Sequence, residues 1–205
     1  MLSQATVIFY EGFDYPALAE GNSIENADGG IGWTAPWTVG NSQVEYHTTG
    51  LAHSTSLPTG GGSVILRGSL DEISRTFDTS GVRTDDGAVQ YISMLVNPQG
   101  NDPETSFILI RLTWSDTPDN DQVDFWMNPV LLNGQLGAAD ETQTGNFDTS
   151  NNVNEIYLPD NNGESYIADE FRMGTTLNDV MLVPEPAATA LLGTLLFLGL
   201  ILRRK

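Results

Sequence analysis

Residues 106–114, whose sequence is SFILIRLTW, indicate the fold more strongly than any other part of the chain. Side chains of a β-strand alternate between its two faces. One face of this segment carries Ile108, Ile110, Leu112 and Trp114, and the other carries Phe107, Leu109, Arg111 and Thr113. Both faces are largely apolar, as in a strand that lies inside a sheet and is covered on both sides. The segment therefore predicts a central strand.

Seven further segments have the β-branched and aromatic composition of strands. They span residues 7–13, 63–67, 72–77, 88–96, 122–132, 153–158 and 166–173, and Pro129 interrupts the fifth. Turn-forming residues separate most of them, and no internal repeat or helix-length amphipathic pattern precedes residue 184. This spacing predicts an all-β fold, a two-sheet antiparallel β-sandwich formed by one domain at residues 6–183.

The composition restricts the classes of partner and of chemistry. The 205-residue chain has a formal net charge of −19 and no cysteine. Before residue 184, five arginines and 26 acidic residues give a net charge of −21, and the chain's only lysine is Lys205. Such a surface repels phosphate backbones, so we expect no nucleic-acid partner. The absence of cysteine excludes disulfides, thiolate metal sites and cysteine nucleophiles.

Residues 184–205 differ in character from the rest. They consist of Pro184, Glu185 and Pro186, an apolar run at 187–202, and Arg203, Arg204 and Lys205. A helix over the 16-residue run is about 24 Å long, which is short for a hydrocarbon core of about 30 Å. The three cations favour a cytoplasmic end, which leaves the body outside the cytoplasm. The run therefore predicts a single C-terminal transmembrane helix.

The first residues have an ambiguous character. Residues 1–5 lack the basic and apolar regions of a signal peptide, but Ser3 and Ala5 occupy the small positions that end one. We hypothesise that residues 1–5 are a signal-peptide remnant whose earlier part is encoded upstream.

The three-part tail resembles the PEP-CTERM sorting signal of bacterial exported proteins. The resemblance implies recognition by an exosortase, a transpeptidase-like membrane enzyme, with removal of the tail near residues 184–186. It also implies a protein that is first held in the membrane and is then released or attached at the cell surface or in an extracellular polysaccharide matrix.

The body resembles the concanavalin-like (LamG-like) jelly roll. The similar segments are residues 11–16 (EGFDYP), Gly32-Trp33 with Trp37, residues 77–81 (FDTSG) and residues 169–176 (DEFRMGTT). The resemblance implies one domain in which the first and last strands pair or lie close together. It implies no defined activity.

Catalytic motifs are missing from the sequence. The alternating acids of a laminarinase-like strand, E-x-D-x-x-E, do not occur. The nearest approach, at residues 121–124 beside Trp126, does not place its acids on one strand face. A G-x-S-x-G nucleophile elbow is also missing. We therefore predict no catalytic residues and no enzymatic activity.

Calcium is the cofactor that the acidic residues favour. Asp116, Asp119 and Asp121 lie in an oxygen-rich loop that lacks the Gly and Glu of an EF-hand. Jelly-roll modules often hold a structural calcium near their chain ends, so the resemblance implies a second candidate, formed by Glu11 or Asp14 with Asp169. For both candidates the alternative is a solvated turn.

Two tryptophans occur in the poorly periodic segment at residues 14–60. Trp33 and Trp37 are a candidate stacking platform for a sugar, and the alternative is a hydrophobic anchor for a long loop. Together these patterns favour a non-catalytic exported β-sandwich that binds glycans. The alternatives are a glycoside hydrolase of the same fold and a purely structural matrix component.

Overall fold

The computed structural model describes residues 7–40, 44–53, 60–67, 71–99, 104–117, 119–132, 134–146, 154–160 and 165–181. Residues 1–5 and the tail from residue 184 lie outside these ranges. Within the ranges, no helix is long and apolar enough to cross a membrane. The transmembrane helix at residues 187–202 and the signal-peptide remnant therefore stay predictions.

Strands dominate the described chain. They are β1 (Val7–Glu11), β2 (Thr38–Val39), β3 (Val44–His47), β4 (Ser63–Leu66), β5 (Asp71–Thr76), β6 (Val89–Pro98), β7 (Ser106–Thr113), β8 (Asp121–Met127), β9 (Leu131–Leu132), β10 (Gln135–Leu136), β11 (Glu141–Gly145), β12 (Glu155–Asp160) and β13 (Tyr166–Gly174). The helical elements are a 3-10 turn at Thr79–Gly81 and α1 (Leu177–Val180).

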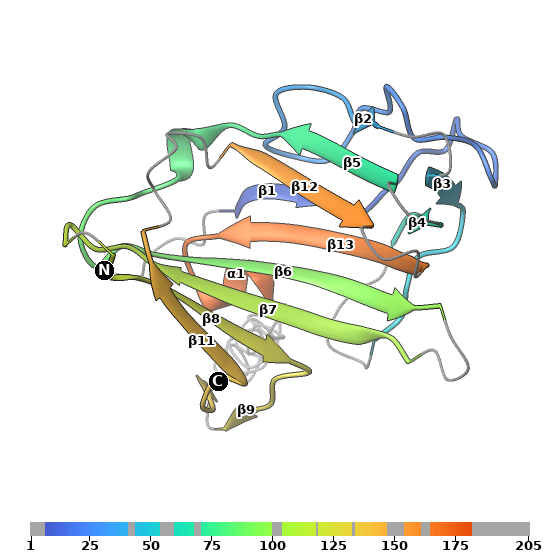
Figure 1. The fold of residues 1–205 in the computed structure, drawn as a ribbon. Coiled ribbons are helices and arrows are strands. Elements are labelled where there is room, and N and C mark those ends of the chain that lie inside the picture. The colour runs from blue at the N-terminus through green and yellow to red at the C-terminus, as the bar shows by residue number, and fades with distance from the viewer. Residues whose placement is uncertain are drawn as a thin grey trace, which may run out of the picture.

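The strands form a large sheet and a small sheet (Figure 1). The large sheet has the order β11-β8-β7-β6-β13-β4-β3, and β1 also pairs with β13. The small sheet has the order β12-β5-β2, and β9 and β10 form a hairpin. All these pairings are antiparallel. The predicted all-β antiparallel class is therefore confirmed.

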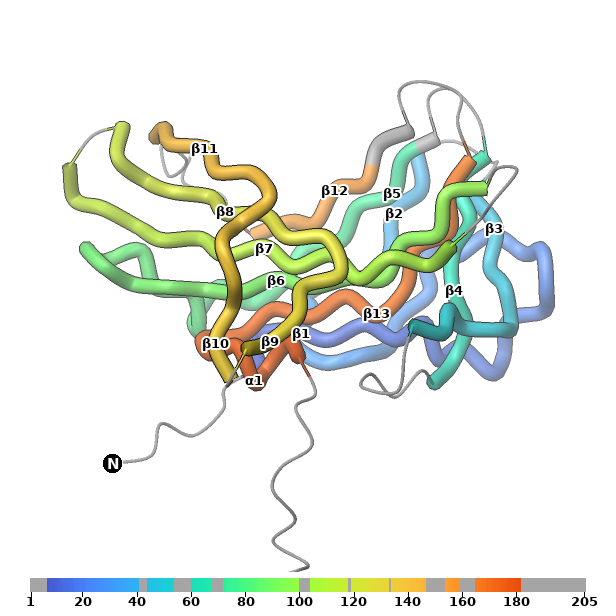
Figure 2. The backbone as a smooth tube through the Cα atoms, turned by 90° about the horizontal axis from the view of Figure 1, so that it is seen from below, coloured from blue at the N-terminus to red at the C-terminus, as the bar shows by residue number. Residues whose placement is uncertain are grey.

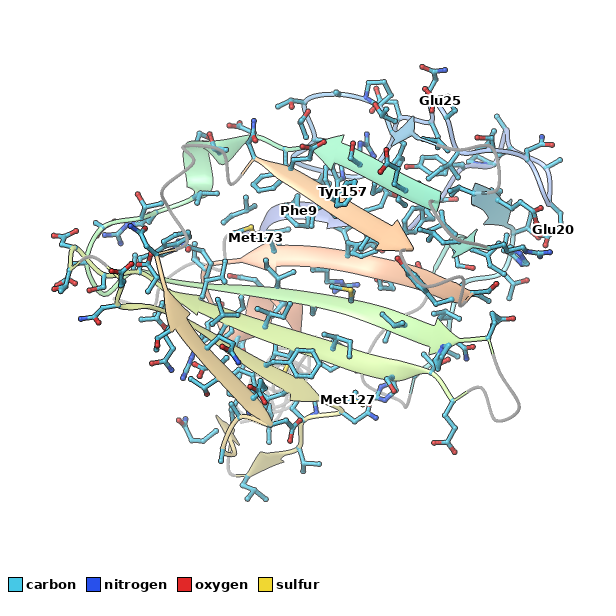
Figure 3. All side chains as sticks on the ribbon, in the orientation of Figure 1. Phe9, Glu20, Glu25, Met127, Tyr157 and Met173 are labelled. Carbon is cyan, nitrogen blue, oxygen red and sulfur yellow. The ribbon has the colours of Figure 1, made fainter. Side chains whose placement is uncertain are left out.

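Two hydrophobic cores lie on opposite faces of the large sheet. Core 1 fills the space between the small sheet and strands β1, β3, β4 and β13, and includes Phe9, Ile73 and Met173 (Figure 3). Core 2 lies against β6, β7 and β8 and consists of Leu51, Leu95, Phe107, Leu109, Trp126 and Val180. Figure 2 shows α1 and the β9–β10 hairpin on the side away from the small sheet. This layering is consistent with the predicted two-sheet sandwich.

The central position of β7 is confirmed, because it pairs with β6 on one side and β8 on the other. Phe107 and Leu109 are buried in core 2. The opposite face is covered less than predicted, since Ile108, Ile110 and Leu112 are only half-buried. The small sheet packs on the other half of the large sheet, so this face lacks a complete second layer.

The predicted strand at residues 122–132 is instead two strands, β8 and β9. Asn128 has a φ of 52°, a left-handed conformation that ends β8. Its side-chain oxygen accepts a hydrogen bond from the backbone N–H of Phe107 at 2.7 Å. Pro129 follows and has no N–H to donate to a ladder.

The ends of the domain meet as the jelly-roll resemblance implies. β1 pairs with β13, so Tyr10 lies opposite Arg172 and Glu11 opposite Phe171. β1 stops at Glu11, two residues before the predicted end, because Phe13 has a φ of 48°. The short strands β2, β3 and β10 and the edge strand β11 lie outside the predicted segments.

Candidate functional site

Glu11, a predicted calcium ligand, is a buried acceptor at the end of β1. It is 1% exposed, and its carboxylate accepts hydrogen bonds from the Phe13 N–H at 2.8 Å and the Tyr15 hydroxyl at 2.7 Å. The left-handed Phe13 backbone follows directly and places this N–H close to the carboxylate. Burial raises the pKa of Glu11, while these donors and Arg75 oppose the rise.

Arg75 neutralises Glu11 from the small sheet. Its fully buried guanidinium forms an ion pair with Glu11 and a second one with Asp28. Its Nε also donates to the Ala35 carbonyl at 2.7 Å. Because Glu11 belongs to β1 and Arg75 to β5, this ion pair joins the two sheets through core 1. The contacts of Glu11 are those of a structural anion.

Both predicted platform tryptophans contact this ion pair. The Arg75 guanidinium carbon lies 4.8 Å from the Trp33 ring centroid and 5.6 Å from that of Trp37. Trp37 is 1% exposed, stacks on Phe13 and donates its indole N–H to the Tyr15 hydroxyl at 2.9 Å. A ring buried in this way offers no face to a sugar. This geometry agrees with the alternative of a hydrophobic anchor, and only the partly buried Trp33 retains some exposure.

A β-bulge in β13 buries two more carboxylates. The register shifts between Asp169 and Arg172, and Glu170 has a φ of 56°. Both Asp169 oxygens accept backbone N–H groups, one from Leu51 and one from Glu170, each at 2.7 Å. Burial, together with the charges of Glu170 and Glu11, raises the pKa of Asp169 to about 8. Arg172 pairs with Glu170 at 2.7 Å.

The remaining predicted calcium ligands lie on the surface or in a strand end. Asp14, Asp116 and Asp119 are exposed. Asp121 is buried at the start of β8, where it accepts the Ser115 N–H at 2.8 Å. In the part of the chain that the structure describes, no three acidic or histidine side chains form a group that could hold a metal ion. Calcium binding therefore stays a prediction.

The carboxylate nearest to a glycosidase-like arrangement, Asp124, is also held by donors. Arg111 donates to it at 2.6 Å and Thr142 at 2.7 Å. Burial disfavours its charged form, but the hydrogen bonds from Thr142, Arg111 and Gln122 outweigh that effect and lower the pKa of Asp124. A carboxylate held in its ionised form is a poor proton donor, which argues against a role as the general acid of a glycosidase.

An open apolar strip on the large sheet was not predicted from the sequence. We define the apolar strip as Ile108, Ile110 and Leu112 of β7 with Val123 and Phe125 of β8. Cross-strand pairing places Ile110 beside Phe125 and Leu112 beside Val123. All five side chains are half-buried, and none belongs to core 1 or core 2 or packs against either. Residues 106–114 supply the β7 half of this strip, and their pattern predicted that both faces of the strand are covered.

The apolar strip continues the face that bears core 1. Ile92 and Met94 of β6 pair with Ile110 and Ile108 of β7, and both pack against core 1. Beyond β8, the edge strand β11 adds Glu141 opposite Phe125 and Gln143 opposite Val123. The strip therefore lies between core 1 and a polar margin, and it is the candidate binding surface of the described chain.

Comparison of the chain with protein-family models, with curated proteins and with solved structures finds no match.

Replacing Arg75 by alanine tests the ion pair between the sheets. Arg75→Ala leaves the buried Glu11 carboxylate without its cation, and we expect it to lower the free energy of unfolding by about 3–5 kcal/mol. Urea denaturation measures the change. The control is Arg83→Ala, which breaks an exposed pair with Asp85 and should have little effect. Equal effects of the two substitutions would contradict the structural role of Arg75.

Asp169 predicts a pH dependence of stability. Its pKa is about 8 in the folded protein and 3.8 without the protein's influence. Between these values the folded protein holds a proton that the unfolded chain releases, so rising pH favours unfolding. Relative to Asp169→Asn, we expect wild type to lose about 1.4 kcal/mol per pH unit across this window.

The measurement is urea denaturation of wild type and Asp169→Asn at several pH values from about 5 to about 7, within the window that the raised pKa defines. Asp14→Asn, at an exposed position, is the control and should run parallel to wild type. Parallel curves for wild type and Asp169→Asn would show that burial does not keep Asp169 protonated.

Proposed function

We propose that this chain is an exported, exosortase-processed protein whose non-catalytic β-sandwich acts at the cell surface or in an extracellular polysaccharide matrix. The observation that carries the proposal is the order of Pro184-Glu185-Pro186, the apolar run at 187–202 and the basic residues at 203–205. We further propose that the body is a jelly roll of the concanavalin-like class. The pairing of β1 with β13 and the packing of a small sheet on half of a large one support this class.

The environments of the buried carboxylates support a non-catalytic body. Glu11, Glu170 and Asp124 each pair with an arginine. Asp169 accepts two backbone N–H groups instead. Groups held in this way stabilise the fold, whereas a glycosidase needs two free carboxyl groups that converge on a substrate. This contrast favours binding or scaffolding over hydrolysis.

The apolar strip is the surface that we propose for glycan binding. Aromatic and aliphatic side chains pack against the C–H faces of sugar rings, and Phe125 supplies an aromatic ring on this strip. The carboxylate of Glu141 and the amide of Gln143 lie at its margin, where they can hydrogen-bond sugar hydroxyls. A net charge of −21 before residue 184 opposes an anionic polymer, so the proposed ligand is a neutral glycan.

Intact mass tests the processing of the tail. Protein recovered from its native source should lack residues after the Pro184–Pro186 region or carry an attached group in their place. Pro184→Ala combined with Pro186→Ala should leave a full-length chain in the membrane fraction, because both prolines of the sorting motif are lost. A wild-type chain of full-length mass in the membrane would instead make the tail a permanent anchor.

A glycan screen with calcium present tests the apolar strip. Wild type should bind neutral glycans, and Phe125→Ser should bind roughly tenfold more weakly, which corresponds to about 1.4 kcal/mol. Tyr157→Ser is the control, because Tyr157 is 51% exposed on β12, outside the apolar strip. No binding by wild type would favour a purely structural matrix component, and hydrolysis of β-glucans or uronic-acid polymers would favour a glycoside hydrolase.

A further inference from the structure

Three large apolar side chains project into solvent around the β9–β10 hairpin. Met127 is 53% exposed, Val130 is 70% exposed and Leu132 is 68% exposed. We call these three residues the apolar tip. Met127 ends β8 and pairs with Ile108 at the end of the apolar strip, Val130 lies between β8 and β9, and Leu132 ends β9, so their exposed surfaces lie in one short segment. Exposed apolar residues grouped in this way mark a surface that contacts a partner.

The β9–β10 hairpin, which carries Leu132 of the tip, lies on the side of the domain where the described chain ends. Leu136 and Ala139, which follow the tip, pack against core 2, and so do Leu177 and Met181 of the α1 segment. The Trp126 indole N–H donates to the carbonyls of Gly137 and Ala138 at 3.2 and 3.0 Å. Figure 2 shows β9, β10 and α1 together on this side. The hairpin is thus fixed beside the end of the described chain.

The covalent length of the chain limits how far this side can lie from the apolar run. Five residues, 182–186, separate Met181 from the run that begins at residue 187. The six steps from Met181 to Ala187 span at most about 22 Å in a fully extended chain. With residues 187–202 inserted in a bilayer, Met181 must therefore lie within that distance of the membrane. The β9–β10 hairpin, on the same side as α1, is then close to the headgroup region.

The charged residues of the domain favour one kind of lipid surface over another. Asp140 is exposed beside the tip and accepts the Met127 N–H at 2.8 Å. All five basic residues before residue 184 are arginines, and each is in an ion pair with a carboxylate. The domain therefore offers no free cluster of cations to anionic headgroups. A zwitterionic surface fits an apolar tip beside an acidic residue.

We propose that the apolar tip is a lipid-contact surface that docks the domain on a zwitterionic bilayer while the tail is still attached. Side chains of this kind insert to a shallow depth at the boundary of headgroups and acyl chains. Docking of the tip holds the β9–β10 side against the membrane and leaves the small sheet away from it. The inference depends on the proposed membrane insertion of the tail.

Because the chain has no cysteine, a single introduced cysteine can be labelled selectively. Full-length protein carrying Leu132→Cys is labelled with the fluorophore NBD and reconstituted into phosphatidylcholine vesicles. We expect blue-shifted emission, and roughly twofold stronger quenching by lipid-borne nitroxides than at the control position, since the probe enters the interface. Tyr157→Cys is that control. Tyr157 is exposed on β12, and Figure 3 shows it on the opposite side of the ribbon from Met127.

Flotation of the same vesicles separates this inference from the proposed function. Flotation with the expected quenching at residue 132 supports both. Flotation with equal quenching at residues 132 and 157 overturns the lipid contact and leaves the insertion of the tail intact. Failure to float overturns both proposals. A blue shift at residue 132 that appears with rising protein concentration and without vesicles would identify a second copy of the chain as the partner, and would also overturn the lipid contact.

Discussion

The buried ion pair between Glu11 and Arg75 is the interaction on which the two-layer arrangement depends. It connects β1 of the large sheet to β5 of the small sheet through the interior of core 1. A buried charge that loses its partner destabilises the fold. A shift of one sheet against the other would separate the pair, so the pair opposes such a shift. The Arg75 guanidinium also contacts Trp33 and Trp37, and so it fixes the long segment between β1 and β3 to the core.

The same solution recurs at two other buried carboxylates. Arg172 pairs with Glu170 in the β13 bulge, and Arg111 pairs with Asp124 across β7 and β8. A domain with only five arginines before residue 184 thus uses three of them inside or at the margin of its fold. Most of the remaining acidic residues are left to the surface. The chain thus pairs three of its few arginines with buried carboxylates, and its net charge stays strongly negative because so few cations are present.

Strand positions could be predicted from the sequence, because alternation and β-branched composition depend on local residues alone. The covering of the β7 face could not, because it depends on how far the small sheet extends over the large one. Strand β11 was missed because its residues, ETQTG, are polar and almost all exposed. Glu11 was singled out as a candidate calcium ligand, but its ion pair with Arg75 was not predicted. The two residues are 64 positions apart, and no spacing rule connects them.

The arrangement of the arginines also bears on resistance to proteases. Enzymes with trypsin-like specificity cut after arginine or lysine, and they need that side chain and several flanking residues in an accessible, extended form. Arg75, Arg111 and Arg172 lie within hydrogen-bonded strands, so cleavage there requires the strand to leave its sheet first. Among the described arginines, only Arg67 and Arg83 have side chains that are nearly half exposed or more. This scarcity of open cleavage sites favours resistance of the folded domain to such enzymes.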